Sequence, residues 1–169
     1  MSAPLLAAYD DVVALVDDLW AHPELGYQET YTAARVTEFL AAHAPGVEIQ
    51  SFARTGLKLR LGPGLDRAVA LVAELDALIV PAHPAADPTT GAVHACGHHT
   101  QVGIACAVVA ELANRPWDLP YDLVVIFVPA EEYVDLDTRR ALRDADEIAW
   151  FGGKPEAMRL GVFDDVDVA

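Results

Sequence analysis

The chain has 169 residues, and more than half of them are apolar, which is enough for one globular domain with a hydrophobic core. Its formal net charge of −15 argues against a nucleic-acid partner, because phosphate binding needs clustered Lys and Arg, and its eleven basic residues form no run. No apolar run reaches the roughly 20 residues of a membrane span, and the start MSAPLLAAYDD lacks the basic region of a secretory signal.

The first half of the chain predicts helices and then strands. Apolar residues from Pro4 to Trp20 recur at helical spacing, and a second helix is expected from Thr30 to His43. The period then changes to the two-residue alternation of strands, first from Val47 to Phe52 and more clearly from Leu57 to Leu61. The segment from Ala68 to Leu75 is nearly all apolar and predicts a buried strand.

The second half alternates between the same two kinds of element. Residues 79 to 92 are rich in Pro, Ala and Thr and predict a loop. The expected elements after it are a helix at His99–Asn114, a buried strand at Leu123–Val128, helices at Thr138–Ala145 and Lys154–Leu160, and the start of a strand at Val166–Ala169. Strands alternating with helices predict a layered α/β domain, a sheet with flanking helices, and nothing divides the chain into two domains.

The densest cluster of metal-binding side chains is His94-Ala95-Cys96-Gly97-His98-His99. Cysteine and histidine are usual ligands of zinc and related ions. Gly97 lets the backbone bend, so that Cys96 and His98 can turn toward one point. A loop with a buried thiol and surface histidines would contain the same residues, so the cluster by itself leaves both interpretations open.

Acidic residues follow both predicted buried strands, at the edge where sites form in open α/β sheets. Of the adjacent pair Glu131 and Glu132, one could bind a metal while the other takes a proton from a water molecule. Asp76 could orient a ligand histidine. The alternatives are a helix N-terminus that favours acidic residues and an ordinary strand-to-loop transition. The Cys/His cluster and the two acidic clusters all lie at or just beyond strand ends. The sequence therefore favours one site that joins the three.

Four segments carry a resemblance to a known family. They are HPELG at His22–Gly26, ELDAL at Glu74–Leu78, HACGH at His94–His98 and PAEE at Pro129–Glu132. In this order they resemble the two-metal amidohydrolases and metallopeptidases that include hippurate hydrolase, bacterial aminoacylases and auxin-conjugate hydrolases. The resemblance extends from about residue 22 to residue 169. It implies a two-metal exopeptidase-like catalytic domain that hydrolyses amide bonds in N-acyl amino acids or small peptides.

The resemblance also implies roles for individual residues. Cys96 would bridge two metal ions, and His98 and Glu132 would be further ligands. Glu131 would be the general base, and Asp76 would support the site. Zn, Mn, Co and Ni are all compatible with such ligands. His99 stands where the family usually has aspartate, so it is expected to be a spare ligand, a supporting group or a plain surface histidine.

The main departure from the family is length. Its members are roughly twice as long or more, with a smaller lid and dimerisation domain and two further histidine ligands downstream. On that comparison, residues 1–169 are expected to be a truncated catalytic domain without the lid or the C-terminal part. The isolated chain is then expected to bind metal weakly, to show little or no amidase activity, and to self-associate or pair with the missing half.

Two alternatives to an enzyme remain open at this point. One is a catalytically inactive metal-binding or interaction fragment, and the other is a structural domain with a zinc site closed to water. The expected partner is a small N-acyl amino acid or peptide, with no nucleic acid and no membrane. Only two cysteines are present, so we expect reduced thiols and a cytoplasmic protein.

Overall fold

Four strands form the main sheet of the computed structural model, which describes residues 8–169. They are β1 (Ile49–Phe52), β2 (Gly56–Leu61), β3 (Ala68–Glu74) and β6 (Asp122–Val128), and they lie in the order β1-β2-β6-β3. β6 pairs in parallel with β3 and antiparallel with β2, which also pairs antiparallel with β1. Because β3 and β6 are parallel, the segments that follow them leave the sheet at the same edge.

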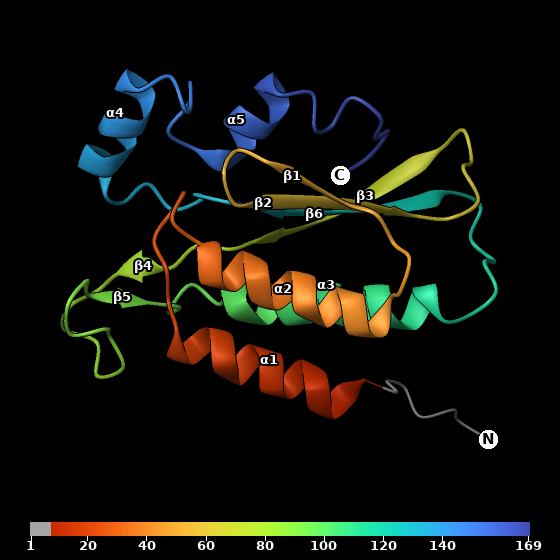
Figure 1. Cartoon of the computed structure of the whole chain (residues 1–169), viewed down its shortest axis with the longest axis horizontal. Coiled ribbons are helices and arrows are strands. Elements are labelled where there is room, and N and C mark those ends of the chain that lie inside the picture. Colours follow the sequence, from red (N-terminus) through yellow and green to blue (C-terminus); the bar gives the residue numbers. More distant parts are fainter. Residues whose placement is uncertain (1–7) are drawn as a thin grey trace.

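Helices lie on both sides of this sheet (Figure 1). α2 (Thr30–His43) and α3 (His98–Ala113) lie on one side, and α1 (Tyr9–Ala21) packs on the outside of this pair. α4 (Leu136–Asp144) and α5 (Gly153–Arg159) lie on the opposite side. The predicted fold class, a layered α/β sheet with flanking helices, is confirmed.

The central strand β6 is buried along its whole length. Its side chains alternate between two cores, as the pleat of a strand requires. Leu123, Val125 and Phe127 pack in the core beneath α1, α2 and α3, whereas the residues between them pack in the smaller core beside α5. β6 is therefore fixed from both faces, and it holds the PAEE segment that follows it in a defined place.

Most predicted helices have the expected bounds within one or two residues. α2 begins and ends where it was predicted, and α3, α4 and α5 each begin one or two residues earlier. α1 begins at Tyr9, and the predicted helical residues 4–7 lie outside the described part of the chain. None of the helices found between residues 8 and 169 has the length and apolarity to cross a membrane.

Three predictions about strands need correction. The predicted buried strand is β3, but four of its residues, 69–72, are only half buried because β3 lies at the edge of the main sheet. The predicted loop 79–92 is closed by a short ladder between β4 (Leu78–Ile79) and β5 (Ala92–Val93). The strand expected at Val166–Ala169 is reduced to one bridge between Val69 and Val168.

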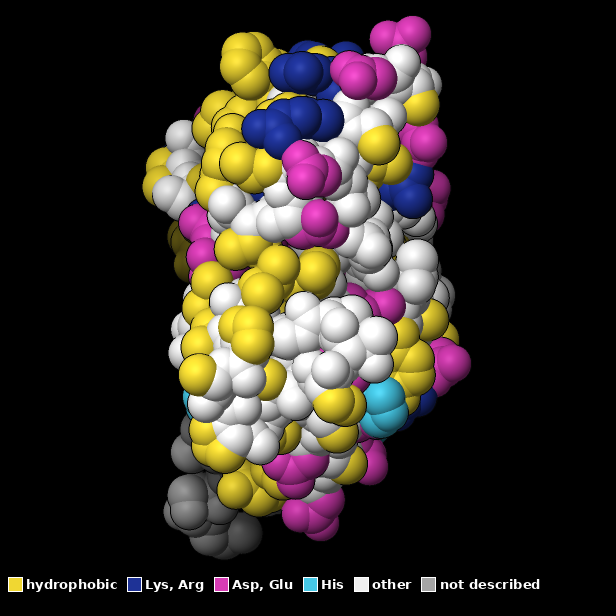
Figure 2. Space-filling model, turned by 90° about the vertical axis from the view of Figure 1, so that its left-hand side faces the viewer, with side chains coloured by type: hydrophobic (Ala, Val, Ile, Leu, Met, Phe, Trp, Pro, Cys, Tyr) yellow, Lys and Arg dark blue, Asp and Glu magenta, His cyan; other side chains and the backbone are white. Residues whose placement is uncertain are grey.

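The acidic stretch from Asp135 to Glu147 predicts a solvated helix face, and that prediction is wrong for one residue. α4 does present charged side chains to solvent, and Figure 2 shows Lys and Arg at the upper end of the molecule, where α4 lies. Arg139, however, is fully buried. It points toward the PAEE segment and Phe151, whose backbone carbonyls accept its hydrogen bonds, and the charged composition of the helix does not reveal this buried role.

Candidate metal centre

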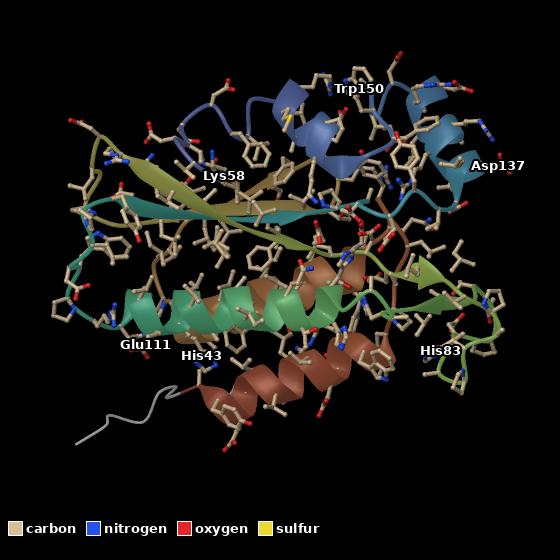
Figure 3. The ribbon with its side chains drawn as sticks, turned by 180° about the vertical axis from the view of Figure 1, so that it is seen from behind. His43, Lys58, His83, Glu111, Asp137 and Trp150 are labelled. Atoms are coloured by element: carbon tan, nitrogen blue, oxygen red, sulfur yellow. The ribbon has the colours of Figure 1, made fainter. Side chains whose placement is uncertain are left out.

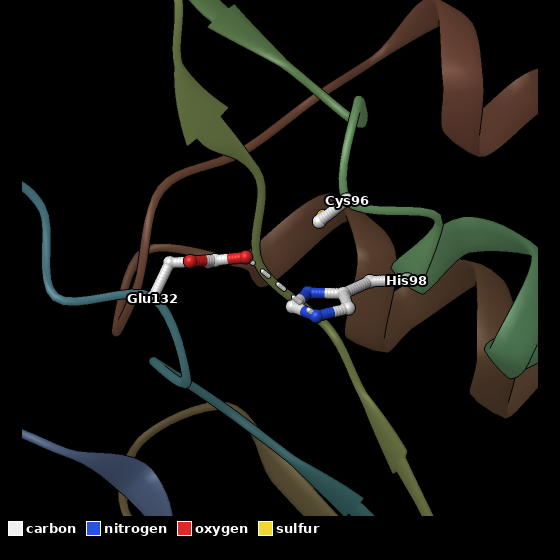
Figure 4. A group of neighbouring side chains, drawn as sticks. All are labelled: Cys96, His98 and Glu132. Atoms are coloured by element: carbon white, nitrogen blue, oxygen red, sulfur yellow. Dashed lines mark ion pairs between the residues drawn. The ribbon is translucent and has the colours of Figure 1, made fainter.

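Cys96, His98 and Glu132 meet at the edge where β3 and β6 end (Figure 4). One ligand atom of each, a sulfur, a ring nitrogen and a carboxylate oxygen, lies within 4.8 Å of the other two. Metal–ligand bonds of about 2.0–2.3 Å place two ligands of one ion at most about 4.6 Å apart. The His98 Nε2 and Glu132 Oε1 atoms are already 3.9 Å apart. Small side-chain rotations therefore suffice for the group to fit one divalent ion.

The turn before α3 presents Cys96 and His98 to the same point. Gly97 lies between them with a φ of +92°, a left-handed conformation that glycine adopts without strain. His98 is buried in the first turn of α3 and Cys96 is half buried. The expectation that Gly97 bends the backbone at this point is confirmed.

His98 is oriented by Asp76, which lies two residues after the end of β3. Its Nδ1 lies 2.8 Å from the backbone carbonyl oxygen of Asp76, so the Nδ1 hydrogen is donated there, and Nε2, 3.9 Å from Glu132 Oε1, is left for a metal ion. Burial alone would lower the pKa of His98, but hydrogen bonding to Asp76 and Cys96 outweighs burial and raises the pKa to about 11. The negative groups that favour a proton at this histidine also favour a metal ion.

Asp76 connects the two halves of the centre. It is fully buried, its Oδ1 accepts the backbone N–H of Glu131 at 3.0 Å, and its Oδ2 accepts that of Glu132 at 2.9 Å. Its Oδ1 also lies 3.4 Å from His98 Nδ1. One carboxylate thus contacts the turn with the histidine and the loop with both glutamates, a wider set of contacts than the support of one histidine expected from the sequence.

A second group of ligand-type atoms shares His98. Glu74, His98 and Glu131 also offer one ligand atom each within 4.8 Å of one another. Glu74 Oε2 lies 3.1 Å from His98 Nε2. The ammonium group of Lys154 forms an ion pair with Glu74 and lies 3.5 Å from Glu131 Oε1. The sequence placed Glu74 within the ELDAL motif without giving it a role, and it predicted no role for Lys154.

The loop that carries the two glutamates rests on buried polar residues. Ala130 has a φ of +54°, and its N–H is accepted by Glu29 Oε1 at 2.8 Å. Thr55 donates to the other oxygen of Glu29 at 2.6 Å. The Arg139 guanidinium donates to the carbonyl oxygens of Phe151 and of Glu132. These contacts hold the backbone between β6 and α4 in one conformation.

Sequence reasoning missed Glu29 and Arg139. Glu29 acts over a long sequence separation, whereas Arg139 bonds to carbonyls 7 to 12 residues away, and neither lies in a motif that describes its partner. One signal exists at Gly26, where an added Cβ would lie 2.3 Å from Arg139 Nη2 and 2.7 Å from the Cα of Ala130. The glycine of the HPELG segment therefore marks the close approach of the arginine and the loop.

The structure does not bring His99 into either ligand group. Its ring packs against Trp20 and His94, with centroids 5.1 and 5.3 Å apart, and the residue is half buried. His43 and His83 also lie away from the centre, near the end of α2 and in the loop between β4 and β5 (Figure 3). Cys106 is fully buried within α3, as a core residue would be.

Comparisons with known proteins agree with this geometry. The model of peptidase family M20/M25/M40 matches residues 70–161, more than half of the chain. An N-acyl-L-amino acid amidohydrolase of Geobacillus stearothermophilus is 30% identical over 162 residues, which cover 94% of this chain and 39% of that protein. An N-acetyldiaminopimelate deacetylase of Bacillus subtilis is 32% identical over 128 residues, covering 73% of this chain and 33% of that one.

A solved structure shares the fold over nearly the whole chain. The YXEP protein of Bacillus subtilis, described as a dinuclear metal binding peptidase of the M20 family, aligns with a TM-score of 0.74 and 25% identity. The alignment covers 96% of this chain and 42% of that protein. The chain thus spans about a third to two fifths of the length of the proteins that it resembles. On the family match and this shared fold, the chain belongs to peptidase family M20/M25/M40.

Proposed function

We propose that this chain binds a divalent metal ion through Cys96, His98 and Glu132, as part of a site that hydrolyses amide bonds. The observation that carries the proposal is the convergence of these three ligand types at one edge of the sheet, with Glu131 beside them. Membership of the M20 family supports the metal-dependent hydrolysis. The name of the Geobacillus relative supports N-acyl amino acids as substrates, and small peptides are the alternative within the family.

The chemistry divides between the ion and the glutamate next to it. A divalent ion held there would polarise the substrate carbonyl and make a water molecule nucleophilic near neutral pH. Glu131 is the residue that we assign as the general base, because its side chain is about one-third exposed and its backbone is fixed by Asp76. It would take the proton from the attacking water and deliver it to the leaving amine.

The donor set suits Zn, Mn, Co or Ni and is sufficient for one ion. A catalytic zinc usually has three protein ligands and one open position. Two ions need more ligands than Cys96, His98 and Glu132. We propose that residues outside 1–169 supply these ligands and a lid that excludes water, so that residues 1–169 act as part of a catalytic domain. The edge position of β3 is compatible with pairing to a further segment or a second copy.

The Glu131→Gln variant tests the proposed reaction. It should keep metal and fold but hydrolyse N-acyl amino acids about a hundred to ten thousand times more slowly, the usual worth of general-base catalysis. Rates are measured with Zn, Mn or Co, on the chain alone and together with the C-terminal part of an M20 relative. Glu111→Gln is the matched control, because Glu111 is an exposed residue of α3 far from the centre (Figure 3).

The possible results test the role of Glu131 and the hydrolysis itself separately. Equal rates for the wild type and Glu131→Gln would contradict the role of Glu131. Metal binding without turnover in either assembly would contradict the hydrolysis. That result would favour a metal-binding fragment that has no catalytic activity of its own.

A further inference from the structure

His98 belongs to two groups of ligand-type side chains, and its Nε2 lies 3.1 Å from Glu74 Oε2 in one and 3.9 Å from Glu132 Oε1 in the other. The first group adds the Cys96 sulfur and a Glu132 oxygen to His98, and the second adds oxygens of Glu74 and Glu131. Because Nδ1 is engaged by the Asp76 carbonyl, the imidazole has a single nitrogen to offer. The two groups differ in chemistry. The first includes a thiolate, which suits zinc, while the second is rich in oxygen, which suits harder ions such as manganese.

Lys154 contacts only one of these groups. Its ammonium pairs with Glu74 and lies 3.5 Å from Glu131 Oε1, so it stands between the two carboxylates of the oxygen-rich group. An ammonium group is a compact cation with three donors and no acceptor, so it can satisfy two carboxylates but cannot bind a metal ion while protonated. Its positive charge lies beside two carboxylates that would otherwise attract a metal ion.

The position of Lys154 is fixed by the start of α5. The helix begins at Gly153, whose N–H is accepted by Ala130 O at 3.0 Å. A Cβ on Gly153 would lie 1.6 Å from the carbonyl oxygen of Pro129, so only glycine permits this approach. The same close contact that joins α5 to the end of β6 brings the next residue, Lys154, over the carboxylates. The packing of α5 therefore places this charge beside the carboxylates, although the Lys154 side chain is 40% exposed.

We propose that Lys154 is a positioning residue that sets the metal selectivity of the centre. Its ammonium keeps divalent ions away from the oxygen-rich group and leaves His98 to the ion bound by Cys96 and Glu132. It also keeps Glu131 free of metal, as a general base must be. This inference rests on the proposed function for its meaning, but the behaviour of the oxygen-rich group can be measured independently of it.

The test measures Mn²⁺ binding in a Cys96→Ala background, where the sulfur-containing group is disabled. Adding Lys154→Met should tighten Mn²⁺ binding at least about tenfold, because a unit positive charge next to two carboxylates is removed. Adding Lys154→Arg should leave the binding unchanged, since the charge is kept. The further change Glu74→Gln should abolish the gain. Free Mn²⁺ is followed by electron paramagnetic resonance, and folding by circular dichroism.

Lys58→Met in the same background is the matched control. Lys58 is the only other lysine of the chain, and it pairs with Asp165 on another part of the protein, so this variant changes the net charge equally. If Lys154→Met does not fold, Lys154→Gln replaces it. Equal Mn²⁺ affinity with and without Lys154 would overturn the proposal, as would an equal gain from Lys58→Met. Failure of the proposed function would appear elsewhere, as unchanged metal content when Cys96 is replaced in the otherwise native chain.

Discussion

Glu29 is a buried carboxyl group whose environment has a consequence for stability. Burial raises its pKa to about 7, and the negative charge of Asp76 adds to this, although hydrogen bonds from Thr55 and Ala130 oppose it. A carboxyl group with a higher pKa in the folded state binds more protons when folded than when unfolded. The free energy of unfolding must therefore fall as the pH rises from about 4.5 to about 7.

Glu29→Gln should remove this pH dependence. The glutamine can still accept from Ala130 N–H and can donate to Thr55, so it imitates the protonated carboxyl. At pH 8 we expect the variant to be more stable than the wild type by on the order of 2–3 kcal/mol, with little difference at pH 5. Urea unfolding at several pH values measures the effect.

Glu156→Gln is the control with the opposite sign. Glu156 is also buried, but hydrogen bonds from Arg159 and from the backbone of Trp150 outweigh burial and lower its pKa. Its contribution to stability is present above its unfolded-state pKa and is lost as the pH falls, so Glu156→Gln should destabilise the protein at neutral pH. If the wild type and Glu29→Gln show the same change in stability between pH 5 and pH 8, Glu29 is ionised throughout and this account of it is wrong.

Among the elements, α5 requires one particular residue type at its start, a glycine at position 153. Gly153 and its neighbour Gly152 look alike in sequence, but an added Cβ would lie 1.6 Å from a backbone oxygen at Gly153 and no closer than 3.3 Å to side-chain atoms at Gly152. Gly153→Ala should therefore lower the free energy of unfolding by roughly 1–3 kcal/mol or more, as overpacking does, and Gly152→Ala by less. The midpoints of urea unfolding should follow that order, and equal losses would show that α5 is not fixed at Gly153.

Local patterns predicted the elements well where packing agreed with them. The bounds of α2 follow from apolar spacing in its own sequence, and β6 is buried because helices cover both of its faces. The burial of β3 was overestimated, because an apolar run does not reveal which strand lies at the edge of a sheet. The β4–β5 ladder was missed because each partner has only two residues, too few for a period to appear.

The residues of the candidate site also fall into two kinds, those that local motifs reveal and those that only the fold reveals. Cys96, His98, Glu131 and Glu132 lie in short motifs, and a local reading found them. Arg139 and Lys154 reach the site through tertiary contacts, and composition placed Arg139 on a solvated helix face. Residues that position others depend on which distant backbone they meet, and that information is distributed over the whole fold.

At the scale of the molecule, four segments far apart in sequence meet at one edge of the sheet. The parallel pairing of β3 and β6 brings the ELDAL and PAEE segments together, and the turn before α3 adds HACGH. HPELG contributes by packing, because its Gly26 admits Arg139 and its Glu24 accepts hydrogen bonds from the first turn of α2. The order and pairing of the strands therefore create the site. Metal binding is the property that tests most directly whether the segments form one site.

The most direct measurement is the metal content of the two single cysteine variants, Cys96→Ala and Cys106→Ala. Each removes one thiol, but Cys106 lies inside α3 in the core. After loading with Co²⁺, we expect the wild type and Cys106→Ala to bind the ion and show thiolate-to-cobalt charge-transfer absorption, because ligation deprotonates the thiol. Cys96→Ala should lose that absorption and most of the bound metal. Equal metal content and the same absorption in both variants would contradict the assignment of Cys96, and with it the metal centre.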